Sequence, residues 1–136
     1  MLAGAWVLSG DRGLAIARVL YGLGLVAFGV AHFTFLERTA GMVPNWLPDH
    51  VVWAYFTGVT MIAAGVAIIA RVLPRSAATL VALELTLFTL IVWVPTLFPH
   101  PNTEQWNEFV DSCVLTGVAW IVAESYRGEA GSRALH

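Results

Sequence analysis

The sequence has no lysine and a single cysteine, Cys113, and both scarcities narrow the range of functions. Arginine supplies all seven basic residues, and the net charge of −2 argues against the basic surface of a nucleic-acid-binding protein. One cysteine can form no disulfide within the chain and is too few for a zinc or iron–sulfur centre held by thiolates. Cys113 lies in an apolar run, where a cysteine is expected to behave as a small buried hydrophobe.

Charge of either sign is also scarce. Charged residues make up 12% of the 136 residues and hydrophobic residues 58%, whereas a soluble domain has about a quarter charged residues. A membrane-spanning helix needs about 20 mostly apolar residues. The stretches that meet this length run over about 14–36, 51–70, 76–97 and 107–126, followed by a short polar tail over 127–136. The sequence therefore predicts an all-α fold with one domain, an integral membrane four-helix bundle of up-down topology.

The arginines predict the orientation of this bundle. Six of the seven fall at helix ends expected on one side: Arg12, Arg18, Arg71, Arg75, Arg127 and Arg133. Only Arg38 falls on the other side. Arginine accumulates in cytoplasmic loops, so both termini are expected in the cytoplasm. The tryptophans Trp46, Trp53, Trp93 and Trp106 then fall near the outer boundary, where an aromatic belt is expected.

Glycines recur at a helical spacing in the first two spans. Gly22 and Gly29 are seven residues apart, and so are Gly58 and Gly65. A spacing of seven returns a helix to nearly the same face, and small residues on one face let two membrane helices approach closely. Helix packing is the expected role of these four glycines.

Ionisable residues inside an apolar span are the first candidates for a site, because each costs about 2.5 to 3.5 kcal/mol at the membrane centre. Glu84 lies deep in the third span, and Arg18 and Tyr21 share one face of the first span. An Arg18–Glu84 ion pair supported by Tyr21 is the hypothesis. The pair would either fix the helix register or form a proton-linked or quinone head-group site in which Glu84 changes protonation.

A second polar group is expected near the outer boundary. His32 lies close to the outer end of the first span, and Asn107 and Asp111 share a face at the start of the fourth. A His32–Asp111 pair would relay a proton or hold a polar ligand, or would simply be solvated at the interface. His50 and His100 lie in loops at no recognised ligand spacing, so no metal site is expected in this chain.

Three stretches give the chain a resemblance to the DoxX family of small bacterial membrane proteins. They are Arg18 to Ala31-His32-Phe33, then Met42-Val43-Pro44-Asn45-Trp46-Leu47-Pro48 with the helix that follows to Gly65, and Trp106 to Trp120. The resemblance implies a four-helix fold in the bacterial inner membrane and a link to redox metabolism. Some relatives are regarded as subunits of quinone-reducing enzymes, so quinone is a cofactor that the resemblance alone suggests.

The function expected from these observations is a membrane subunit or partner of a quinone-linked redox complex. No cofactor-binding motif is recognised in the chain, so the electron carrier is expected on a partner protein. The alternative is a non-enzymatic membrane scaffold, or a small carrier for an apolar or weakly acidic molecule. A bundle of this size is expected to need a homo-oligomer to carry a solute.

Overall fold

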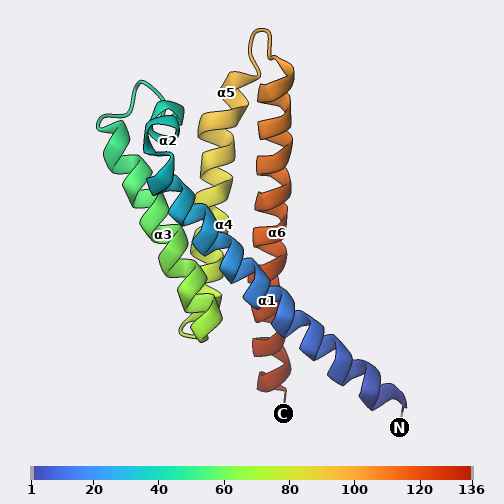
Figure 1. Ribbon diagram of the computed structural model, residues 1–136. Coiled ribbons are helices and arrows are strands. Elements are labelled where there is room, and N and C mark those ends of the chain that lie inside the picture. The colour runs from blue at the N-terminus through green and yellow to red at the C-terminus, as the bar shows by residue number, and fades with distance from the viewer. Residues whose placement is uncertain (1, 136) are drawn as a thin grey trace.

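The computed structural model describes the backbone of residues 2–135 and the side chains of residues 10–131, 134 and 135. The described chain is all-α (Figure 1). Its elements are α1 (Leu2–Thr34), α2 (Leu36–Met42), α3 (His50–Ala70), α4 (Pro74–Phe88), the π-helix η1 (Thr89–Trp93), α5 (Val94–Thr96) and α6 (Thr103–Ala134).

Four segments are long and apolar enough to cross a membrane: Gly10–Thr34, His50–Ala70, Pro74–Thr96 and Thr103–Gly131. Most of their residues face outward rather than into the bundle, as expected for helices whose solvent is lipid. The expectation of an all-α protein with four spanning helices is confirmed, and the chain is a small multi-pass membrane protein.

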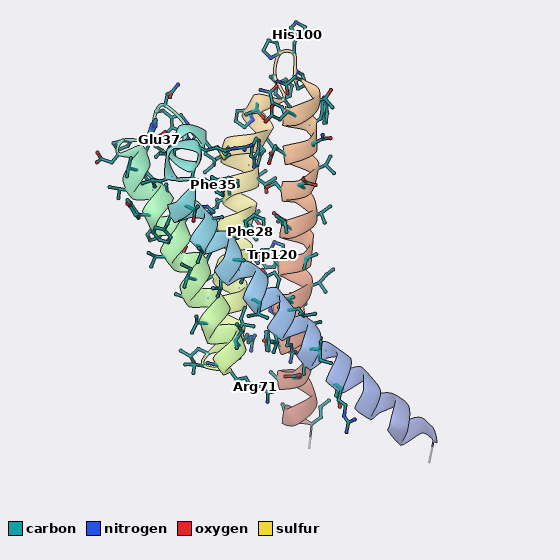
Figure 2. All side chains as sticks on the ribbon, in the orientation of Figure 1. Phe28, Phe35, Glu37, Arg71, His100 and Trp120 are labelled. Atoms are coloured by element: carbon teal, nitrogen blue, oxygen red, sulfur yellow. The ribbon has the colours of Figure 1, made fainter. Side chains whose placement is uncertain are left out.

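The two ends of the bundle differ. The N-terminus and the C-terminus lie at the same end (Figure 1), together with the short connection that contains Arg71 (Figure 2). The opposite end holds α2 and the connection that contains His100 (Figure 2). We call these the N/C end and the loop end.

Glycines place α1 and α3 in backbone contact. A Cβ atom on Gly22 would lie 2.9 Å from the carbonyl oxygen of Gly65, and one on Gly29 would lie 2.7 Å from that of Gly58. Any larger residue would force the two helices apart. The expected packing role of these four glycines is confirmed, and it joins the first two spans as a pair.

Small residues join α4 to α6, and hydroxyl groups join η1 to α6. Ala78 and Ala82 of α4 and Ala119 of α6 are fully buried in the core between these helices. Further along, the Thr89 hydroxyl lies 2.7 Å from that of Ser112 and 3.0 Å from that of Thr116. These hydroxyl groups hydrogen-bond to one another, which adds directional contacts to close packing.

The third span changes helix type before its proline. η1 occupies residues 89–93, and the helix then continues through Pro95 to Thr96. A proline inside an α-helix clashes with the carbonyl group four residues before it. The wider π-turn accommodates Pro95, so the span ends close to its expected boundary at residue 97.

Two expected boundaries are wrong at the N/C end. α6 continues to Ala134, so residues 127–134 are helical rather than a separate polar tail. α1 begins at Leu2 rather than near Leu14. The segment after Arg127 contains no proline, and the helix propagates through Gly128 and Gly131. α6 thereby gains about two further turns, the first of which carries Glu129.

Candidate functional site

A cavity of about 740 Å³ lies among α1, α2, α3, α4 and α6. Its wall includes Tyr21 towards the N/C end and Arg38 and Met42 at the loop end. From Tyr21 to the end of α1 at Thr34 the helix rises about 20 Å, which is roughly two thirds of the hydrocarbon thickness of a bilayer. The cavity is of the size that holds a small organic ligand, usually about 300–1,000 Å³.

Glu84 is the ionisable residue of this wall that lies deepest in the bundle. It is about 15 Å from Pro74 and about 18 Å from Thr96 along the helix, so it lies near the middle of its span. The Thr60 hydroxyl of α3 lies 2.8 Å and 2.9 Å from the two carboxyl oxygens of Glu84. Thr60 is also the central residue of α3, so this pair lies near the midplane of the bundle.

The Thr60 hydroxyl group has three neighbours and one hydrogen. Besides the two Glu84 oxygens, the carbonyl oxygen of Thr57 lies 2.9 Å from it. If Glu84 is ionised, Thr60 donates its hydrogen to the carboxylate. If Glu84 is protonated, it donates to the Thr60 oxygen, and Thr60 donates to Thr57. The same arrangement of heavy atoms therefore accommodates both protonation states of Glu84.

The expected Arg18–Glu84 ion pair is wrong. Arg18 Nη1 lies 2.7 Å from Glu129 Oε1, and Arg18 Nε donates to Ser125 Oγ at 3.0 Å. The guanidinium group lies 3.8 Å from the centroid of the Tyr126 ring. α1 packs on α3 rather than on α4, and the longer α6 brings Glu129 to the level of Arg18. We call Arg18, Ser125, Tyr126 and Glu129 the N/C clasp, because they tie α1 to α6.

A second, looser set of charges lies at the loop end. Arg38 Nη2 is 3.7 Å from both Glu104 Oε1 and Glu108 Oε1. The Arg38 side chain is 64% exposed, whereas that of Arg18 is 12% exposed. We call Arg38, Glu104 and Glu108 the loop clasp, because they tie α2 to α6. The cavity thus lies between two arginine–glutamate contacts, of which the N/C clasp is shorter and more buried.

The expected polar face of α1 does point into the bundle. Tyr21, Leu25, Phe28 and His32 all line the cavity. Phe35 lines it as well, closer to the loop end than Phe28 (Figure 2). The Tyr21 hydroxyl is buried and has no hydrogen-bond partner among the described residues. His32 Nδ1 donates to the carbonyl oxygen of Phe28 at 2.8 Å, which leaves Nε2 of the neutral ring as an acceptor.

The outer polar residues are only partly brought together. His32 and Asp111 both line the cavity, but no hydrogen bond or ion pair joins them in the described part of the chain. Asn107 is exposed on α6 and is not in the cavity wall. Trp93 does not belong to an exposed belt, because it is 9% exposed and lines the cavity, whereas Trp46 is 70% exposed.

Comparison with known families gives a match over residues 21–108 to the model of DUF8561, described as a domain of unknown function. The chain belongs to the DUF8561 family. The matched part of DUF8561 contains Tyr21, Arg38 and Glu84 but ends before Asp111 and the α6 residues of the N/C clasp. No DoxX model is among the matches, so DoxX stays a resemblance. No curated protein and no solved structure matches the chain.

The sequence contains a signal for the Thr60–Glu84 contact that was missed. α3 and α4 are joined by the short connection around Val72, and Thr60 and Glu84 are equally distant from it along the chain. In a tight antiparallel hairpin of helices, such residues lie at one level. Glu129 was missed because residues 127–136 were expected to be a tail, and Ser125 and Tyr126 lay inside the expected fourth span but were not considered as partners of Arg18.

Proposed function

We propose that this DUF8561 protein binds a small lipid-soluble molecule in its cavity and acts as a carrier for it. The cavity with the Glu84–Thr60 pair near the midplane carries this proposal. A carrier needs a site near the middle of the membrane that is closed in turn towards each side. The N/C clasp and the loop clasp are the closures, and the longer contacts of the loop clasp mark the side that opens more easily.

The volume of the cavity bears on the oligomeric state. About 740 Å³ lies within one chain, so ligand binding requires no second copy. A homo-oligomer is compatible with this carrier but is not part of its binding site. On the arginine distribution, the N/C end lies in the cytoplasm of a bacterial inner membrane and the loop end faces the periplasm.

The second candidate function is a membrane subunit or partner of a quinone-linked redox complex. The Tyr21 hydroxyl favours it, because a buried donor without a partner is suited to a quinone carbonyl oxygen placed in the cavity. The electron carrier would belong to a partner protein. The DoxX resemblance supports this candidate, which shares the cavity with the carrier but differs in what happens to the bound molecule.

The experiment that tests the proposal is equilibrium binding to the purified protein in lipid nanodiscs. Trp93 lines the cavity, so a bound ligand should change its fluorescence, and Trp93→Phe should remove that change. The matched control is Trp46→Phe, which removes an exposed tryptophan of the loop end. If no lipid-soluble compound gives a saturable change that depends on Trp93, the proposal is wrong.

Two further measurements separate the two candidates. A carrier takes up the bound compound into proteoliposomes. A redox subunit co-purifies in fixed ratio with a flavin, haem or thiol-redox protein, and its quinone-dependent signal falls in Glu84→Gln. A scaffold, in contrast, tolerates Glu84→Gln with no change in either signal.

A further inference from the structure

We propose that the ligand of this cavity is a lipophilic monovalent cation, which replaces a proton at Glu84. This inference rests on the proposed function, since it names the ligand class of the same cavity. Three observations support it: the excess of carboxyl groups in the cavity wall, the aromatic rings beside them and the two hydrogen-bonding arrangements of Glu84.

The ionisable groups that line the cavity come from α1, α2, α4 and α6, whereas α3 contributes Thr57 and Met61. They are Tyr21 and His32 of α1, Arg38 of α2, Glu84 of α4, and Glu108 and Asp111 of α6. Arg38 already faces Glu104 and Glu108. In the described part of the chain, neither Glu84 nor Asp111 has a basic side chain within ion-pair distance. The wall therefore has an excess of carboxyl groups.

An ionised carboxylate near the midplane needs a positive partner, because its burial in a low-dielectric environment is otherwise costly. The chain supplies none within the described residues, so a proton or a cation from outside must neutralise Glu84. This charge pattern disfavours a weakly acidic ligand, whose anion would be repelled by the same carboxyl groups.

Aromatic rings line the same space. Tyr21, Phe28, Phe35, Phe88 and Trp93 all contribute to the wall. The face of an aromatic ring attracts a cation, and the attraction grows when both are removed from water. Rings together with a carboxylate recognise an organic cation that is apolar over most of its surface, such as a quaternary ammonium or phosphonium ion. A neutral molecule would use the rings but would have no charge with which to displace the proton of Glu84.

The Thr60 hydroxyl group can hydrogen-bond to Glu84 both before and after the cation replaces the proton. In the cation-free state, protonated Glu84 donates to Thr60, which donates to the carbonyl oxygen of Thr57. When the cation enters, the carboxyl proton leaves to water, and Thr60 turns its hydrogen to the carboxylate. One positive charge replaces another, no electron is transferred, and the cavity keeps its net charge in both states.

The test uses two probes of the same shape and opposite charge, tetraphenylphosphonium and tetraphenylborate, with neutral triphenylphosphine oxide as the third. Binding to the full-length protein in nanodiscs is measured by calorimetry between pH 5 and pH 9. We expect saturable binding of the phosphonium, at least tenfold weaker binding of the other two, and release of up to one proton per cation. The proton count comes from repeating the titration in buffers of different ionisation enthalpy.

Glu84→Gln keeps an acceptor for Thr60 but cannot ionise. We expect it to lose at least tenfold in phosphonium affinity and to lose the pH dependence. The matched control is Glu124→Gln, because Glu124 is an exposed glutamate paired with Arg127 outside the cavity. If Glu84→Gln fails to fold, the exchange is tested by proton release from the unmodified protein. Binding without proton release would refute the exchange.

The outcomes separate this inference from the proposed function. If the phosphine oxide or the borate binds as well as the phosphonium, the ligand class is wrong and the cavity remains a binding site. If none of the three binds and Trp93 fluorescence does not respond to any lipid-soluble compound, both the ligand class and the proposed function are wrong.

Discussion

Replacing Gly65 with alanine is expected to destabilise the protein, because the methyl group would meet backbone rather than a flexible side chain. The new Cβ atom would lie 2.5 Å from the carbonyl oxygen of Gly22 and 3.1 Å from the amide nitrogen of Val26. Ordinary contact begins at 3.4 Å, so α1 and α3 must separate by about 0.9 Å. A gap of that size forfeits about a quarter to a half of the dispersion energy of each contact it opens.

Two opposing terms set the magnitude of this effect. Forcing an extra methyl group into a packed interface costs about 1–3 kcal/mol. The higher helix propensity of alanine offsets up to about 1 kcal/mol of this cost. Subtracting the full helix-propensity gain leaves an expected net loss of about 0–2 kcal/mol in the free energy of unfolding. It can be measured by titrating the protein from mild detergent into SDS and following helix content by circular dichroism.

Gly117→Ala is the matched control for this measurement. A Cβ atom on Gly117 of α6 would have nothing within 4 Å. Gly117→Ala therefore gains the helix propensity of alanine without any steric cost. It should be as stable as the unmodified protein or more stable by up to about 1 kcal/mol. If Gly65→Ala is as stable as Gly117→Ala, α1 and α3 do not approach as closely at Gly65 as the structure shows.

Three further variants test the clasps and the contact between η1 and α6. Glu129→Gln should lower the free energy of unfolding in the same SDS titration by about 1–3 kcal/mol, because it leaves the mostly buried Arg18 without its anion; an unchanged midpoint would refute the N/C clasp. Arg38→Ala should change that energy by less than about 1 kcal/mol, since its partners are exposed, and a larger loss would mean a buried pair. Thr89→Val should cost about 0.6–1.7 kcal/mol, and a neutral result would contradict the hydroxyl contacts with Ser112.

The spans and the packing role of the glycines in α1 and α3 could be predicted from the sequence because they depend on local composition. An apolar run of about 20 residues identifies a spanning helix wherever it packs. The spacing of Gly22, Gly29, Gly58 and Gly65 likewise marks two compatible faces before their partners are known. The inward position of Tyr21 and His32 followed from the same periodicity.

The partner of Arg18 could not be predicted, because it depends on which helices are neighbours. Arg18 and Glu84 are suited as a pair by charge, yet α1 packs on α3, and Glu84 meets Thr60 instead. The end of α6 was misassigned because a polar segment with Gly128 and Gly131 resembles a tail when read alone. In the structure this segment is helical and brings Glu129 to Arg18.

The burial of Trp93 is a second feature that composition does not reveal. A tryptophan near the end of a span is typical of the lipid interface. Trp93 ends the π-helix η1, and it contributes to the cavity wall rather than to the exposed surface. A π-turn cannot be recognised from apolar periodicity, although Pro95 two residues later was its local signal.

Photolabelling tests most directly the central claim that the cavity is a ligand-binding site. The unmodified protein in nanodiscs would be irradiated with a triphenylphosphonium that carries a diazirine, and the labelled residues mapped by mass spectrometry. We expect labels on Tyr21, Phe28, Met61 and Leu115 that disappear with excess unlabelled phosphonium. Labels confined to the exposed Leu20, Val59 and Leu87, and unchanged by the competitor, would contradict it.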